Sequence, residues 1–137
     1  MVTDMWFRCS SERFLFSADA SARYAYRYDH KYSNASIFPT FGLPEICAEV
    51  VCHASELPFV FDELPGFTGF TSAEAQLADK MGRLWTTFAK GEPIDAAEWP
   101  VWEPTQRSTL VFNLTSQVES SNAMCDFWDS LADAYFW

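Results

Sequence analysis

The clearest pattern of apolar and polar positions in the chain is a helical one that begins near residue 71. Apolar side chains recur on one helical face, at Leu77, Met81, Leu84, Trp85 and Phe88. Thr71 and Glu74 have the spacing of a capping box, and Lys90 and Gly91 supply the basic last turn and the left-handed cap that commonly end helices. The pattern predicts a helix from Thr71 to Lys90.

Four further elements follow from shorter patterns. Residues 22–32 alternate tyrosines with alanine and charged residues, which predicts a strand, and residues 109–112 predict a second, shorter strand. Near the amino-terminal end we expect a short helix that is capped by Thr3 or Asp4. A last helix is marked by apolar residues at helical spacing, Met124, Phe127, Trp128 and Leu131.

The segments between these elements are predicted to be loops. Turn formers, prolines and glycine break residues 33–45, and polar residues interrupt the apolar stretch 46–61 throughout. Residues 67–70 have the composition of a turn, and the loop 92–104 carries two tryptophans. These helices, two short strands and long loops cannot close a sandwich or a bundle by themselves. We therefore expect the missing strands to come from a segment outside this sequence or from another chain.

Composition and charge narrow the class of protein. The chain has 137 residues, and 49% of them are apolar, which excludes a disordered protein. With 19 acidic against 9 basic residues the formal charge is −10, so nucleic acid and anionic membranes are not expected partners. Aromatic residues make up 18% of the sequence, more than a self-sufficient domain of this size is expected to bury. That excess is typical of a piece of a larger protein.

The four cysteines favour disulfides over a metal site. Cys9, Cys47, Cys52 and Cys125 form no C-x-x-C pair and no Cys/His cluster, so we expect neither a metal nor a cofactor, and three disulfide connectivities are possible. Two glycosylation sequons, weak signals individually, begin at Asn34 and Asn113 and favour a secreted protein. No apolar run of the roughly 18 residues needed for a membrane span is present. The sequence also shows no leader, so if the protein is secreted we expect its true amino terminus to lie upstream.

Two histidines are candidates for acid–base chemistry. His53 lies in a loop between apolar segments, where an imidazole that titrates near neutral pH could take a proton from a serine. A hydrogen-bonded loop histidine is the simpler interpretation of the residue taken alone. His30 follows the predicted strand between Asp29 and Lys31, and we expect it to be structural.

The surroundings of His53 resemble a known family. His53-Ala-Ser-Glu56-Leu-Pro-Phe-Val-Phe61 is similar to the histidine segment of the type-B carboxylesterase and cholinesterase family. The tyrosine-rich run that ends in Asp29-His30, the Trp85-x-x-Phe-Ala-Lys90 run and the Trp99-Pro-x-Trp102 turn are also similar to motifs of that family, in the same order. The final Cys125-Asp-Phe-Trp128 matches as well, so the resemblance extends over nearly the whole chain.

The resemblance implies an α/β-hydrolase fold, of which residues 1–137 form a partial, carboxy-terminal portion with an incomplete sheet and flanking helices. It implies that His53 is the base of a Ser-His-acid triad that cleaves carboxylic esters. It also implies a disulfide between Cys9 and Cys125. Cys47 and Cys52 then remain, and they can bridge only if the intervening loop folds back.

Two departures from the family pattern matter. Ala54 replaces the family's glycine after the histidine, a mild change. None of the five glycines brackets a serine as a G-x-S-x-G nucleophile elbow, and the family's oxyanion loop and acidic segment have no counterpart in the sequence. We therefore expect this chain alone to be inactive and to need the amino-terminal portion of the fold. The alternative is a catalytically inactive binding or adhesion module, although the retention of His53 argues against it. Glu56 as the acid partner of His53 would need an unusual turn.

Overall fold

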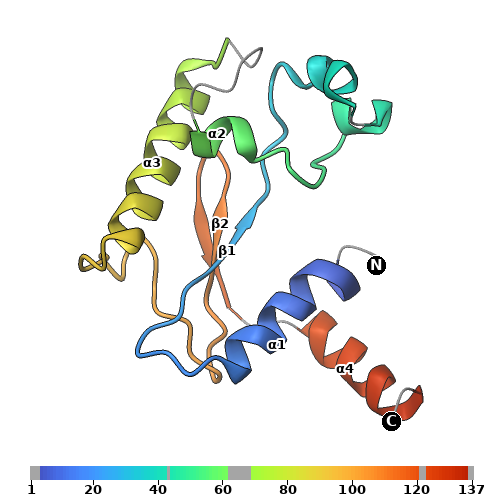
Figure 1. Cartoon of the computed structure of the whole chain (residues 1–137), viewed down its shortest axis with the longest axis vertical. Coiled ribbons are helices and arrows are strands. Elements are labelled where there is room, and N and C mark those ends of the chain that lie inside the picture. Colours follow the sequence, from blue (N-terminus) through green and yellow to red (C-terminus); the bar gives the residue numbers. More distant parts are fainter. Residues whose placement is uncertain (1–3, 43, 62–68, 121–122, 136–137) are drawn as a thin grey trace. The chain divides into compact units, whose positions relative to one another are not determined.

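The computed structural model describes residues 4–42, 44–61, 69–120 and 123–135, without the side chains of residues 37, 41 and 132–135. The chain divides into two compact units. Unit 1 comprises Met1–Ala25, Ala96–Leu110 and Val118–Trp137, and unit 2 comprises Tyr26–Asp95 and Val111–Gln117. Three strands form one sheet in the order β1-β2-β3. Figure 1 traces the helices and strands along the chain.

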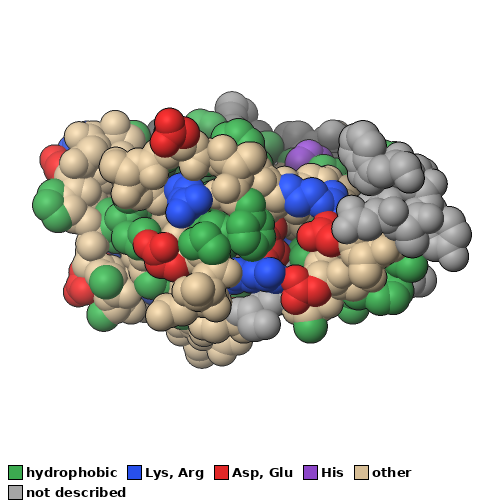
Figure 2. Space-filling view, turned by 90° about the horizontal axis from the view of Figure 1, so that it is seen from below, with side chains coloured by type: hydrophobic (Ala, Val, Ile, Leu, Met, Phe, Trp, Pro, Cys, Tyr) green, Lys and Arg blue, Asp and Glu red, His purple; other side chains and the backbone are tan. Residues whose placement is uncertain are grey.

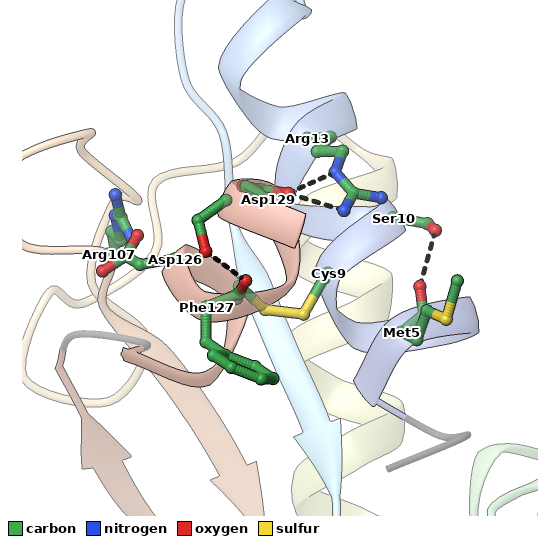
Figure 3. A network of polar contacts seen from close by, with 10 residues as sticks. Met5, Cys9, Ser10, Arg13, Arg107, Asp126, Phe127 and Asp129 are labelled. Carbon is green, nitrogen blue, oxygen red and sulfur yellow. Dashed lines mark hydrogen bonds and ion pairs between the residues drawn. A yellow bond between two sulfur atoms is a disulfide. The ribbon is translucent and has the colours of Figure 1, made fainter. Parts of the chain in front are cut away.

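In unit 1 the first and last helices are joined by a covalent bond. The π-helical turn Asp4–Arg8 leads into α1, Cys9–Ser17, and α4 spans Ala123–Tyr135. Cys9 and Cys125 are disulfide-bonded across 116 residues of sequence. Both Nε and the second terminal nitrogen of Arg13 reach Asp129 Oδ1, at 2.6 and 2.5 Å, as Figure 3 shows. The helices predicted at the two ends of the chain are present. Thr3, one candidate cap, lies outside the described residues, and Asp4, the other, is the first residue of the π-helical turn, so that Arg8 precedes α1.

Arg107 ties the loop before β2 to both helices of unit 1. Its Nε lies 3.2 Å from Glu12 Oε1, and a terminal nitrogen lies 2.5 Å from Asp126 Oδ1. The guanidinium also lies over the ring of Phe16, 5.2 Å from its centroid. Burial would lower the pKa of Arg107, but the hydrogen bond to Asp126, the largest influence, together with the charge of Glu12 raises it. The side chain stays charged at every pH at which the protein is folded.

Unit 2 contains the predicted long helix, α3, Ser72–Ala89. Thr71 and Glu74 form the full capping box, and Gly91 adopts the left-handed conformation after the helix, at φ 68°. The periodic apolar face packs as expected, because Leu77, Met81 and Leu84 are buried. This prediction is confirmed in its start, its end and its buried face.

Two predictions of irregular structure in unit 2 are wrong. Residues 33–45 contain the 3-10 helix Ala35–Phe41, which accommodates Pro39, and Glu45–Ala48 forms a second one. The short helix α2, Leu57–Phe61, lies within the predicted loop 46–61 and contacts α3, beside it in Figure 1. Of the predicted turn 67–70, residues 67 and 68 lie outside the described residues.

The sheet is small. β1 spans Ala25–Tyr28, shorter than the predicted 22–32, β2 spans Thr109–Phe112 as predicted, and β3, Gln117–Glu119, was not expected. The amide of Asp29 donates to the carbonyl of Phe112 at 2.9 Å just after β1 ends. In the described part of the chain β1 pairs with β2 alone, which leaves its other edge without a strand.

Many large apolar side chains reach the surface. Trp6 and Phe14 of unit 1 are 68% and 69% exposed, and Phe61 of unit 2 is 62% exposed. Figure 2 shows hydrophobic side chains between acidic and basic ones on the face drawn there. Single exposed apolar residues are ordinary, but this number of exposed aromatic rings is not. Among the described residues no helix is long and apolar enough to cross a membrane.

Candidate functional site

His53 lies on an exposed turn that leads directly into α2. The amide of Leu57, the first residue of α2, donates to the carbonyl of Ala54 at 3.2 Å. Within α2, the amides of Phe59 and Val60 donate to the carbonyl of Glu56 at 2.9 and 3.0 Å. The helix is therefore continuous in hydrogen bonding with the turn that carries the imidazole.

Ala54 adopts a left-handed backbone conformation, with φ at 71°. A residue with a Cβ pays roughly 1–2 kcal/mol there, whereas glycine does not. The family resemblance places a glycine at this position, and the geometry gives the physical reason. The replacement by alanine is therefore more than a mild change for the backbone, because the turn keeps the glycine-type conformation at an energetic cost.

Ser55 holds the same turn from inside. Its side chain is buried at 1% exposed, and its hydroxyl donates to the carbonyl of Cys52. Its amide donates to the same carbonyl at 3.2 Å. A serine that closes its own turn in this way restricts the backbone between residues 52 and 55. The hydroxyl is engaged in a structural hydrogen bond.

The disulfide Cys47–Cys52 closes the segment before His53. The two Cα atoms lie 5.4 Å apart across five residues of sequence, so the chain folds back as this bridge requires. Cys47 is buried, at 2% exposed, and it lies within the 3-10 helix Glu45–Ala48. Val50 and Val51, between the cysteines, are exposed. The bridge therefore restrains the backbone immediately on the amino-terminal side of His53.

Glu56 caps α2 through its carbonyl, and its side-chain charge acts on the tyrosine strand. Burial, and then the charge of Glu56, raise the pKa of Tyr26. Burial, followed by the charges of Glu74 and Glu56, raises the pKa of Tyr28 far above its ordinary value. Both phenols therefore stay neutral at physiological pH. Neither is poised to act as a base.

The second histidine, His30, lies against a buried carboxylate. Its Nε2 is 3.0 Å from Oε1 of Glu74, and the two side chains are 13% and 1% exposed. Burial would raise the pKa of Glu74, but hydrogen bonds from Ser33, from Thr71 and from His30 lower it to about 2. The spacing of Thr71 and Glu74 predicted a helix cap, and no pattern in the sequence indicated the link of Glu74 to His30. The signal that could have indicated its burial is its position three and seven residues before Leu77 and Met81, on the buried face of the helix.

The aromatic residues of the family-like motifs lie in different environments. Trp99 and Trp102 are buried in unit 1, where Trp99 Nε1 donates to the carbonyl of Ala25 at 2.9 Å. Trp85 packs edge-on against Tyr26, with ring centroids 5.3 Å apart, and Phe88 is exposed. In the described residues no group of three or more His, Cys, Asp or Glu side chains could hold a metal ion.

Taken together, the site offers an exposed imidazole on a restrained turn. It can accept and return a proton, which is the role of a triad base. The sequence contains no G-x-S-x-G elbow to present a nucleophile.

Comparisons with known proteins relate this chain to carboxylesterases. The model of the carboxylesterase family matches residues 1–128. Acetylcholinesterase of Bungarus fasciatus is 32% identical over 115 residues, which cover 77% of this chain and 18% of that protein. Crystal protein of Dictyostelium discoideum is 29% identical over 148 aligned residues, which cover 96% of this chain and 26% of that protein.

Solved structures support the fold. A PNB esterase structure superposes with a TM-score of 0.58 at 26% identity and covers 77% of this chain and 21% of that one. The α/β-hydrolase fold class that the resemblance implied is confirmed, with a small partial sheet and flanking helices in this chain. The chain spans about a quarter or less of the length of these relatives. On the match of residues 1–128 to the family model, this chain belongs to the carboxylesterase family.

Proposed function

We propose that this chain is the carboxy-terminal part of an α/β-hydrolase that cleaves carboxylic esters, and that His53 is the base of its catalytic triad. The observation that carries the proposal is the placement of His53. It is exposed on a turn that a disulfide restrains on one side and α2 on the other. A base that must meet a serine hydroxyl needs this kind of fixed orientation.

In this mechanism His53 takes the proton of the serine hydroxyl while the serine oxygen attacks the ester carbonyl. The imidazolium then gives that proton to the leaving alcohol, and the acyl group stays on the serine. A water molecule attacks the acyl-enzyme in turn, with His53 again accepting and returning one proton. No cofactor takes part in this chemistry.

The serine, the acid and the oxyanion hole must come from a segment that precedes this chain in the fold, because in α/β-hydrolases the triad follows the order serine, acid, histidine. Two structural features support such a completing segment. The outer edge of β1 has no partner strand in the described residues. Tyr28 Oη and Trp85 Nε1 are buried without a hydrogen-bond partner in that part of the chain.

The test compares His53→Gln with the unchanged protein in the complete esterase, using nitrophenyl esters as substrates. We expect kcat to fall by about 10²–10⁴-fold, the usual contribution of general acid–base catalysis. Glu49→Gln is the matched control, because Glu49 is an exposed residue of the same unit that pairs with Lys31 at the surface. Equal turnover by His53→Gln and by the unchanged protein would remove His53 from the mechanism.

The 137-residue chain alone should not hydrolyse these esters faster than free imidazole does, because a base without a nucleophile and an oxyanion hole contributes little. This result separates the proposal from the possibility that the chain is a self-sufficient enzyme. A pure sample that turns over, and loses turnover on His53→Gln, would contradict the proposed division of the triad.

We further propose that the protein enters the secretory pathway. The two disulfides support this location, since such bonds persist in oxidising compartments. The sequons at Asn34 and Asn113 agree with it. The alternative function, a binding or adhesion module without catalysis, predicts that His53→Gln changes no measured activity of the complete protein.

A further inference from the structure

The carboxylate of Glu74, in the first turn of α3, has several hydrogen-bond partners. Oε1 accepts the amide of Ser33 at 2.6 Å and faces His30 Nε2 at 3.0 Å. Oε2 accepts the hydroxyl of Ser33 at 2.7 Å, and the amide and the hydroxyl of Thr71 at 2.9 Å each. One carboxylate thus joins the segment after β1 to the start of α3, across 41 and 44 residues of sequence.

A capping box needs only the local part of this arrangement. The bonds to Thr71 complete the cap, whereas those to His30 and Ser33 go beyond it. A fully buried carboxylate is stable only when its charge is compensated by several donors, and here the donors are supplied. The orientation of the His30 ring is consequently fixed by a charge-assisted hydrogen bond.

This cluster is not a second catalytic triad. The hydroxyl of Ser33 donates to Glu74 and not to the imidazole of His30. A nucleophilic serine would have to give its proton to the histidine. The side chains of His30 and Glu74 are also almost fully buried, at 13% and 1% exposed, where a substrate ester would not reach them. We therefore expect a structural role of the cluster, through the side chains that its His30 ring contacts.

What it holds is the ring of Phe59, in the middle of α2. The ring of His30 meets Phe59 edge-on, with centroids 5.6 Å apart and planes at 86°. Phe59 is completely buried, and it also stacks on Phe70 at 4.7 Å and contacts Tyr28 at 5.4 Å. Such ring pairs have preferred geometries, so a fixed His30 ring restricts where Phe59, and with it α2, can sit.

One hydrogen bond connects α2 with the turn that carries His53. The amide of Leu57 donates to the carbonyl of Ala54, the residue that follows His53. A shift of α2 therefore moves the backbone of the His53 turn on its carboxy-terminal side. The disulfide Cys47–Cys52 restrains only the other side of the turn.

We propose that Glu74 is a positioning residue for His53: by fixing His30, which packs against Phe59, it sets the position of α2 and hence the orientation of the His53 turn. This inference rests on the proposed function for its catalytic consequence. Its structural part, the control of His53 by Glu74 and His30, stands on the contacts above.

The experiment uses the complete esterase with Glu74→Gln, His30→Gln and the surface control Glu49→Gln. Glutamine at position 30 keeps an amide donor for Glu74 and removes the ring, so this variant tests the ring contact without leaving the carboxylate uncompensated. Active sites are counted with an irreversible phosphonylating inhibitor, and kcat is expressed per titrated site. We expect kcat to fall about tenfold or more in Glu74→Gln and in His30→Gln, with KM within about twofold, because a small misplacement of a catalytic group lowers the rate strongly.

A purely structural role would lower the melting temperature and leave kcat per titrated site unchanged. If both variants keep kcat within about twofold of the unchanged protein, Glu74 does not position His53. The inhibitor count matters here, because it removes the unfolded fraction from the comparison.

A second measurement does not depend on turnover. Diethylpyrocarbonate acylates an unprotonated imidazole, and peptide mass spectrometry reports its rate at His53 across pH 5 to 8. We expect this rate, compared at the same pH, to change at least about threefold in Glu74→Gln and His30→Gln and not in Glu49→Gln. If the unchanged protein cleaves no ester, the proposed function fails, and this rate alone decides the positioning role: identical profiles in all four proteins would overturn it.

Discussion

The buried carboxylate of Glu74 makes the start of α3 sensitive to acid, and the size of the effect follows from its surroundings. Hydrogen bonds lower its pKa from the ordinary 4.5 to about 2 in spite of burial. Each pKa unit is worth 1.36 kcal/mol, so ionised Glu74 contributes about 3 kcal/mol to the folded state. The side chain is 1% exposed, and solvent screening therefore takes away little of this value.

The sign follows from the direction of the shift. Because the folded-state pKa is depressed, this stabilisation is complete above pH 4.5 and is lost as the pH falls from 4.5 towards 2. Glu74→Gln removes the ionisable group, so it should be less stable than the unchanged protein at pH 7 and should lack this acid-dependent loss. The glutamine amide also turns two hydrogens toward a site that offers mainly donors, which adds roughly 1–3 kcal/mol for an unsatisfied group.

Hydrogen exchange measured by mass spectrometry tests this locally. The relevant amides are those of Glu74 and Ala75, which donate to Thr71 at 3.2 and 2.9 Å in the first turn of α3. After correction for intrinsic rates, we expect their protection in the unchanged protein to fall by up to about 10²-fold between pH 6 and 2.5. Glu74→Gln should show a low and nearly flat profile, and Glu49→Gln should follow the unchanged protein. A parallel pH dependence in Glu74→Gln would refute the assignment of the effect to this carboxylate.

Three further predictions concern the turn, the long disulfide and the sequons. Ala54→Gly should stabilise the turn by about 0.5–1 kcal/mol, because relief of about 1–2 kcal/mol of left-handed strain exceeds the entropy that glycine adds to the unfolded chain; slower hydrogen exchange across residues 53–57 checks this, and faster exchange contradicts it. Replacing Cys9 and Cys125 by serine removes a 116-residue cross-link worth roughly 4–5 kcal/mol, so proteolysis within α4 should accelerate, and an unchanged cleavage rate would show that the ion pairs suffice. Secreted from a eukaryotic host, the chain should lose glycan mass in Asn113→Gln more than in Asn34→Gln, since Leu114 and Thr115 after Asn113 are exposed whereas Ala35 after Asn34 is buried; equal masses before and after glycosidase treatment would argue against both sites.

Local signals in the sequence were enough for some elements. The capping box and the apolar face of α3 act within one helix, and their consequences could be predicted from spacing alone. The last helix and the strand β2 were predicted for the same reason. Short elements were missed: α2 has five residues, one of them proline, and β3 has three, so neither shows a period.

His53 could be selected as a candidate from the sequence, but the contacts that hold its turn could not be predicted. His53 was found through the family resemblance of its segment, since one histidine in a loop is a weak signal by itself. The partners of Glu74 lie 41 and 44 residues away in sequence, and no local pattern specifies such pairs. The left-handed conformation of Ala54 was also hidden, because alanine gives no sign of a positive φ.

The strain at Ala54 is informative about the whole turn. A conformation that costs roughly 1–2 kcal/mol persists only where neighbouring interactions determine the backbone more strongly than the residue's own preference. Three such interactions meet here: the disulfide Cys47–Cys52, the bond from the Ser55 hydroxyl to Cys52, and the hydrogen bond from Leu57 to Ala54 that starts α2. They act on both sides of His53, so its Cα can move little even though its side chain is exposed. A turn that keeps this shape with alanine in place of glycine is held by its surroundings, and a fixed backbone is what an exposed imidazole needs in order to serve as a base of defined orientation.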